Sequence, residues 1–182
     1  FVNILRSAQK FISNANKNKV ENNPAQKESQ AVIVRLSDIQ PEPISWLWPE
    51  RIALGKLTLI VGDPGLGKSL ISLAMAAALS KGYLWPVDGT RAPIGDTILL
   101  SAEDDPADTI RPRLDAAKAD CNRVHVLKAI QNLEVDAEGK PTERIFSLRN
   151  DIPILEKALL PLPDCKLIVV DPISAYLDGT ES

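Results

Sequence analysis

The stretch of sequence that decides the fold is Gly62-Asp63-Pro64-Gly65-Leu66-Gly67-Lys68-Ser69, in which two glycines separated by four residues are followed by Lys and Ser. The apolar run 57–61 leads into it and the apolar run 70–79 follows it. Strand, glycine loop and helix is the context in which this pattern forms a phosphate-binding loop. A glycine-rich turn before a core helix is the alternative interpretation, and the two matching flanks argue against it.

The residue types of this loop suit a nucleoside triphosphate. Glycines let successive backbone N–H groups converge on a phosphate, and the helix that starts near Lys68 adds the positive end of its dipole. We expect Lys68 to neutralise the β and γ phosphates of ATP, and the Ser69 hydroxyl to bind Mg²⁺. The expected nucleotide-binding residues are Gly62, Asp63, Pro64, Gly65, Leu66, Gly67, Lys68, Ser69 and Leu70.

Length and composition limit the other possibilities. The 182 residues suit one domain with its own core, and the formal net charge of −3 argues against a strongly basic surface. Two cysteines, Cys121 and Cys165, are too few for a disulfide framework and indicate reduced thiols in a cytoplasmic protein. With no signal peptide and no apolar run of about 20 residues, we expect no membrane association. The chain starts with Phe1 and stops soon after a strand-like run, so we expect a fragment.

Strand and helix patterns alternate along the chain. Residues 1–30 are predicted to be a flexible N-terminal segment, and residues 31–182 a nucleotide-binding core that is incomplete at its C-terminus. Strands are expected at 31–36, 57–61, 97–100, 123–127 and 166–171, and a loop or hairpin at 133–141. Helices are expected at 68–80, with a stop at Lys81-Gly82, at 107–119 and at 151–160. Asp105 is expected to cap the second helix, and Pro112 to kink it or delay its start. The pattern predicts an α/β fold with a mainly parallel sheet and helices on both of its faces.

Two of the expected strands end in acidic residues. Glu103 follows the strand 97–100, and Asp171 ends the strand 166–171. Ligands of open α/β sheets lie beyond the carboxyl ends of the strands, so both acids are delivered to the edge that carries the phosphate loop. We expect Asp171 to act at the Mg²⁺ site together with Ser69, and Glu103 to activate the attacking water. Asp104 is the alternative to Glu103, and simple helix or turn caps are the alternative for all three acids.

Other chemistry-bearing side chains have plainer explanations. Trp46 and Trp48 are more consistent with closing the edge of a core than with flanking a base. His125 alternates within an apolar strand, which favours a structural role over a catalytic one. Arg111 and Arg113 lie on the expected helix 107–119, where a solvated face explains them as well as a catalytic role does.

Several runs of the chain resemble the RepA-like branch of the RecA/DnaB ATPases. They are Trp46-Leu47-Trp48-Pro49, Ile52-Ala53-Leu54-Gly55-Lys56-Leu57, the phosphate loop, Leu100-Ser101-Ala102-Glu103-Asp104-Asp105 and Val169-Val170-Asp171-Pro172-Ile173-Ser174-Ala175-Tyr176-Leu177, within about residues 40–178. The resemblance implies a three-layer RecA-like P-loop NTPase and a homo-hexameric ring that works on single-stranded DNA as a helicase or primase-helicase of plasmids, phages or integrated elements. It also implies a catalytic glutamate at Glu103. The family's later strands, with their DNA loops and arginine finger, would lie beyond Ser182.

Three functions are therefore compared. The first is an ATP-hydrolysing helicase motor, which the phosphate loop, Glu103 and Asp171 favour. The second is a nucleotide-gated replication or repair assembly without strand unwinding, which suits the lack of a basic patch. The third is a small-molecule kinase, for which the sequence offers no acceptor site.

Overall fold

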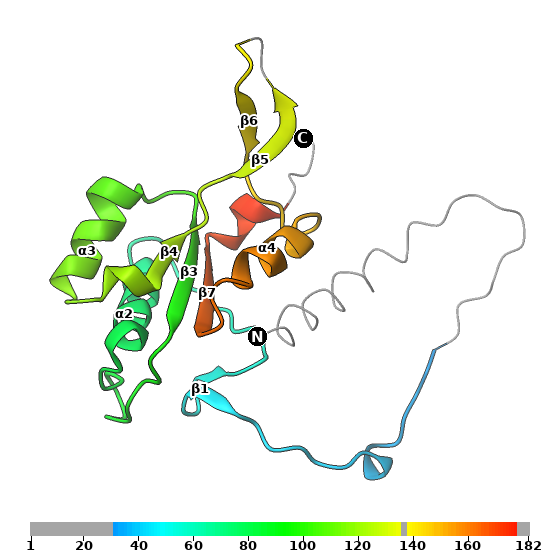
Figure 1. Cartoon of the computed structure of the whole chain (residues 1–182). Coiled ribbons are helices and arrows are strands. Elements are labelled where there is room, and N and C mark those ends of the chain that lie inside the picture. Colours follow the sequence, from blue (N-terminus) through cyan, green and yellow to red (C-terminus); the bar gives the residue numbers. More distant parts are fainter. Residues whose placement is uncertain (1–30, 136–137, 178–182) are drawn as a thin grey trace, which may run out of the picture.

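The computed structural model describes residues 31–135 and 138–177, and this part of the chain contains both helices and strands (Figure 1). In chain order the elements are β1 Trp46–Trp48, β2 Ile52–Ala53, α2 Lys68–Lys81, β3 Asp96–Ser101, α3 Arg111–Ala116, β4 Val124–Val126, β5 Ile130–Val135, β6 Pro141–Arg144, α4 Ile152–Leu159 and β7 Cys165–Asp171. The predicted flexible segment 1–30 lies outside the described residues. No helix of the described ranges is long and apolar enough to span a membrane.

A parallel sheet of order β4-β3-β7 is the centre of the fold, and two antiparallel pairs, β1-β2 and β5-β6, accompany it. The register sets Ser101 opposite Asp171 at the carboxyl ends of β3 and β7. The ladder continues one step further, because the Ala102 N–H donates to the Asp171 carbonyl oxygen at 3.0 Å. The two strand-end segments that carry the candidate acids are therefore fixed side by side.

Helices cover both faces of this sheet. Leu99 of β3 packs in one apolar cluster with Leu73 of α2 and Leu114 of α3, whereas Ile98 and Leu100 pack in another with residues of α4. Alternate side chains of a strand point to opposite faces, so β3 is buried along its whole apolar length. The parallel sheet with helices on both faces agrees with the α/β class predicted from the sequence.

Two expected strands are absent from the described residues. The run 57–61 joins no sheet, and Leu57 and Val61 are 82% and 80% exposed. The run 31–36 is also unpaired, and a single 3₁₀ turn, Leu36–Asp38, follows it. Both predictions were wrong for the same reason, because an apolar β-branched run becomes a strand only where a neighbouring strand bonds its backbone.

The helices follow their local signals. Gly67 and Gly82 flank α2 in the left-handed conformation, and α2 confirms the predicted helix 68–80 with its glycine stop. The expected helix 107–119 is instead a π-type turn, Pro106–Ile110, followed by the short α3. Pro112 is the physical reason, because it has no N–H to continue the bonding pattern of the preceding turn. Asp105 caps this segment as predicted, accepting hydrogen bonds from the N–H groups of residues 107 and 108.

The tryptophans divide between core and surface. Trp48 is 7% exposed and stacks on Trp85 with 4.8 Å between the ring centroids, and its indole N–H donates to Asp88. Core packing is therefore confirmed for Trp48. Trp46, in contrast, is 40% exposed. His125 lies in β4 with its Nε2 3.7 Å from the Asp96 carboxylate, which agrees with a structural role.

An ion pair between a buried carboxylate and a half-exposed arginine closes the connection between β6 and α4. Asp151, only 2% exposed, accepts hydrogen bonds from both terminal nitrogens of the Arg144 guanidinium and from the Ser147 N–H. These bonds to Arg144 and to the backbone hold the pKa of the Asp151 carboxyl below its usual range, against the opposing effect of burial. The segment that leads from the β5-β6 hairpin into α4 thus satisfies its own buried charge.

Candidate functional site

The phosphate loop has the backbone shape that its glycines allow. Gly65 and Gly67 take φ angles of +80° and +82°, a region that favours glycine over residues with a side chain. The Lys68 ammonium donates to the carbonyl oxygens of Gly62 and Asp63, each at 2.8 Å. The lysine is therefore folded over its own loop, and its ammonium lies at the start of α2, where a phosphate would bind.

A small cavity of about 20 Å³ lies where this helix meets the carboxyl ends of β3 and β7. Its polar lining comes from α2, from β7 and from the segment after β3: Ser69, Ser72, Ser101, Asp104 and Asp171. Apolar side chains close the rest of it, namely Leu73, Leu99, Leu100, Ile110 and Val169. The cavity has room for about one water molecule. It is too small for a whole nucleotide.

The chemistry of this cavity fits Mg²⁺. Ser69 and Asp171 supply a hydroxyl and a carboxylate, and oxygen ligands are what Mg²⁺ prefers. No group of three or more His, Cys, Asp or Glu side chains suited to a metal occurs among the described residues. The fold therefore brings together the two residues that the sequence assigned to the metal.

The two candidate acids after β3 are placed differently. Glu103 is exposed and does not line the cavity, whereas Asp104 is half-buried and does. The Asp104 N–H donates to the Ser101 hydroxyl at 3.3 Å, and its carboxylate accepts from Arg113 at 2.9 Å. Glu103 lies on the same segment after β3, at the surface. Its assignment as the water-activating residue stays a prediction.

The surroundings of the cavity are partly apolar. Tyr176, 5% exposed, packs against Phe146, and burial raises the pKa of its phenol, with a further contribution from the negative charge of Asp171. His125 does not line this cavity, so the candidate site uses no imidazole. The cavity is thus lined by hydroxyl and carboxylate oxygens on one side and by apolar side chains such as Leu73 and Leu99 on the other.

The sequence pattern assigns no role at this site to Ser72 or Ser101, and it leaves Arg113 open between a solvated face and a catalytic role. Ser72 lies one helical turn after Lys68, and its hydroxyl donates to the Lys68 carbonyl oxygen. Ser101 ends β3 on the rung opposite Asp171. Arg113 reaches Asp104 from α3. For Ser101 the signal was available, since a polar residue at the carboxyl end of a buried strand points to the ligand edge. For Arg113 no sequence signal separated it from Arg111.

The glycine loop before a buried helix, the parallel sheet, and a strand-end Asp that lines one cavity with the loop Ser are features of P-loop NTPases, although the run 57–61 that leads into the loop is not a strand here. The comparison with protein families agrees, because the model of the AAA domain matches residues 22–182. The chain belongs to this AAA-domain family, whose members are in general nucleotide-binding ATPases. Searches of curated proteins and of solved structures gave no match to the chain.

Proposed function

We propose that this protein binds ATP with Mg²⁺ and hydrolyses it as the motor of a DNA helicase or primase-helicase of a mobile element. The observation that carries the ATPase part is the meeting of Ser69 and Asp171 in one oxygen-lined cavity at the start of the phosphate-loop helix. The helicase part is supported by the resemblance of the Ser-Ala-Glu-Asp-Asp run and of the Asp-Pro-Ile run to the RepA-like ATPases. The same resemblance supports a three-layer RecA-like core, a homo-hexamer and single-stranded DNA as partner, and the two cysteines, read as reduced thiols, support a cytoplasmic location.

The binding step uses the loop. The N–H groups around Gly65 and Gly67 converge on the phosphates, with contributions from the rest of residues 62–70. Lys68 exchanges its two carbonyl acceptors for phosphate oxygens, which carry full negative charge and bind an ammonium more strongly. Bound Mg²⁺ would neutralise charge on the β and γ phosphates, held by the Ser69 hydroxyl and, through water, by Asp171.

The chemical step is attack of water on the γ phosphorus. A bond from the water oxygen to phosphorus forms, the bond to the bridging oxygen of ADP breaks, and inorganic phosphate is released. Glu103 orients the water and takes its proton, and Lys68 stabilises the charge that develops on the phosphate oxygens. Glu103 is exposed in the free protein, so closure of its segment over bound nucleotide is part of the proposed mechanism.

Two substitutions test binding and chemistry separately. In the intact protein Lys68→Ala should weaken ATP binding about ten- to hundredfold, because a charge-assisted hydrogen bond is lost. Lys81→Ala, at the far end of the same helix, is the control and should bind normally. Isothermal titration with ATP and Mg²⁺ measures both. Unchanged affinity of the Lys68 variant would rule out the proposed nucleotide site.

Glu103→Gln should lower ATP turnover about a hundredfold or more while ATP still binds, since general-base catalysis is removed and the loop is intact. Asp108→Asn changes an exposed acid a few residues further on and should turn over normally. If Glu103→Gln hydrolyses ATP at the normal rate, the glutamate does not activate the water. The same measurement on Asp104→Asn then decides whether its neighbour does.

A second candidate function is a nucleotide-gated replication or repair assembly that does not unwind DNA. The formal net charge of −3 favours it, because a protein that tracks along DNA usually carries a basic surface. Strand displacement by the intact protein, with ATP and a forked DNA, separates the two functions. Displacement that Glu103→Gln abolishes supports the helicase, and ATP-dependent assembly on DNA without displacement supports the second candidate.

A further inference from the structure

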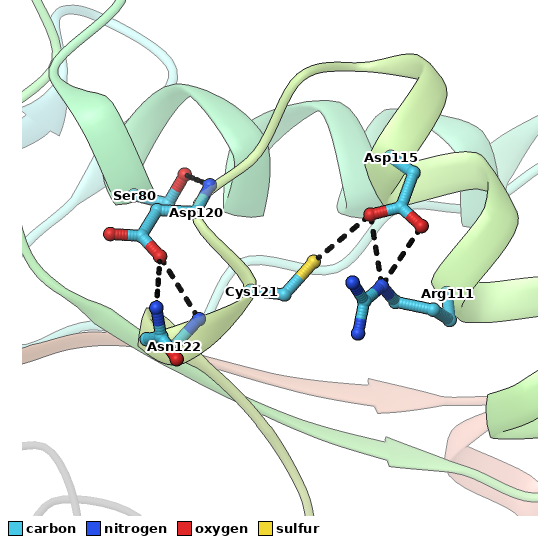
Figure 2. A network of polar contacts seen from close by, with 6 residues as sticks. All are labelled: Ser80, Arg111, Asp115, Asp120, Cys121 and Asn122. Atoms are coloured by element: carbon cyan, nitrogen blue, oxygen red, sulfur yellow. Dashed lines mark hydrogen bonds and ion pairs between the residues drawn. The ribbon is translucent and has the colours of Figure 1, made fainter.

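Arg111 and Arg113 lie two residues apart on α3 and bind different partners. Arg111 donates through Nε to both oxygens of Asp115, four residues on along the same helix, as Figure 2 shows. Arg113 points the other way and donates to Asp104, nine residues back, at 2.9 Å. Only the second arginine therefore contacts a residue that lines the cavity with Ser69 and Asp171.

Asp104 is held from two directions. Its N–H donates to the Ser101 hydroxyl, which fixes the backbone to the end of β3, and its carboxylate accepts from the Arg113 guanidinium. The side chains of Arg113 and Asp104 are 40% and 26% exposed. Ion pairs this accessible to solvent contribute little to folding stability. The ion pair therefore fixes the position of the Asp104 carboxylate and adds little to the stability of the fold.

The arginine itself is anchored to the phosphate-loop helix. Its neighbour Leu114 and Ile110 of the preceding turn are each 3% exposed and pack with Leu73 of α2. Ser69 stands one turn before Leu73 on that same helix. The backbone that carries Arg113 is thus fixed relative to the hydroxyl that the proposed function assigns to Mg²⁺.

We propose that Arg113 is a positioning residue of the nucleotide site, which holds the Asp104 carboxylate at the cavity so that it supports the hydrated Mg²⁺ together with Ser69 and Asp171. This inference rests on the proposed function, since it requires Mg²⁺-nucleotide at this edge of the sheet. Asp104 acts through water bound to the cation, in keeping with the room for about one water molecule in the cavity.

A positioning role and a purely electrostatic one predict opposite signs. Removal of a positive charge beside the cavity would, by electrostatics alone, attract a cation more strongly and lower the Mg²⁺ concentration needed. Loss of positioning frees Asp104 to turn towards solvent and raises that concentration. The direction of the shift therefore decides between the two effects.

The experiment measures binding of a fluorescent ADP to the intact protein as a function of Mg²⁺ concentration. For Arg113→Met we expect the Mg²⁺ concentration at half-saturation to rise about five- to tenfold, with unchanged affinity for ADP in the presence of a chelator. Arg113→Lys keeps the charge without the planar fork and should recover part of the shift. Arg111→Met is the matched control and should behave as the unchanged protein.

A double substitution identifies the route. Asp104→Asn should raise the Mg²⁺ requirement by a similar factor, and Arg113→Met added to it should have no further effect if the arginine acts through that carboxylate. A lower Mg²⁺ requirement, additive effects, or equal behaviour of Arg111→Met and Arg113→Met would each overturn the inference while leaving the nucleotide site intact. Failure of the unchanged protein to bind Mg²⁺-ADP would overturn the proposed function as well. Urea unfolding confirms that the variants are folded.

Discussion

The phosphate loop and the connection from β6 to α4 are both irregular segments with charged groups, but their charged groups have different hydrogen-bond partners. In the connection, the carboxylate of Asp151 is buried and is bonded by Arg144 and by backbone within the same segment. In the loop region, the apolar run 57–61 is exposed and Lys68 binds only carbonyl oxygens of its own loop. The connection pairs its buried charge within the chain, whereas the phosphate loop keeps an ammonium and an apolar run that a ligand could contact.

The difference between the two segments indicates which groups can still bind a ligand. Groups that bond each other within the chain stabilise the fold and are not available to a partner. Groups that bond weakly, or that leave apolar surface in solvent, retain free energy that binding can release. The contrast between the two segments can therefore be measured as a difference between effects on stability and effects on nucleotide affinity.

The largest effect is expected in the connection. Asp151→Ala should lower the free energy of unfolding by about 3 kcal/mol at neutral pH, because it removes a buried carboxylate that accepts hydrogen bonds from the half-exposed Arg144 guanidinium and leaves the Ser147 N–H without its acceptor. The folded-state pKa is lowered, so this contribution is present above the unfolded pKa of about 4 and is lost as the pH falls through the folded pKa. Urea unfolding at several pH values measures it. Asp115→Ala, which breaks an exposed pair, should cost less than about 1 kcal/mol.

The next effect is expected in the phosphate loop. Saturation with Mg²⁺-ADP at a hundred times its dissociation constant should slow amide hydrogen exchange in residues 57–67 about a hundredfold, equivalent to about 2.7 kcal/mol. Residues 144–151 should show no change, because they are complete without the ligand. Equal protection of the two segments, or none in the loop, would contradict the contrast drawn between them.

A third effect concerns the start of β7, at the end of the strand away from the cavity. Burial raises the pKa of the Cys165 thiol to about 11. A raised folded-state pKa means that stability is lost as the pH rises, here by about 2 kcal/mol between roughly pH 9 and 11. Cys165→Ala should flatten this part of the pH profile of unfolding, whereas Cys121→Ala should keep most of it. A profile that stays steep without Cys165 would assign the loss to other groups.

The smallest effect separates two glycines of the same geometry. Gly65 and Gly55 have φ angles of +80° and +73°, and a Cβ at either would meet no atom within 4 Å. Alanine at either position should therefore cost about 1 kcal/mol of stability, from backbone strain alone. Only Gly65→Ala should also weaken ATP binding, by about tenfold, because its Cβ enters the space of a phosphate. Equal ATP affinity of the two variants would place the phosphate elsewhere.

The parts of the fold that could be predicted are those that local signals determine. A few neighbouring residues were enough to predict three features. They are the glycines at both ends of α2, the Asp105 cap, and the continuous apolar runs of β3 and β7. The same holds for the meeting of Ser69 and Asp171, because the carboxyl ends of parallel strands share one edge.

The parts that failed depend on distant partners. Residues 57–61 have a strand's composition, but whether they pair is decided by another strand and not by their own sequence. Arg111 and Arg113 are equivalent on a helical pattern, and only the path of the chain after β3 brings Asp104 within reach of one of them. The break in the helix 107–119 was expected from Pro112, whereas the end of α3 at Ala116 was not predicted.

The pairing of Ser101 with Asp171 has a consequence for how the register of β3 and β7 is selected. A slip of one residue between β3 and β7 would turn the Asp171 side chain to the other face of the sheet, away from Ser69. Misaligned molecules would then be unable to hold the cation, so nucleotide would reward only correctly aligned ones. Bound nucleotide would therefore raise the population of molecules in which β3 and β7 pair in the correct register.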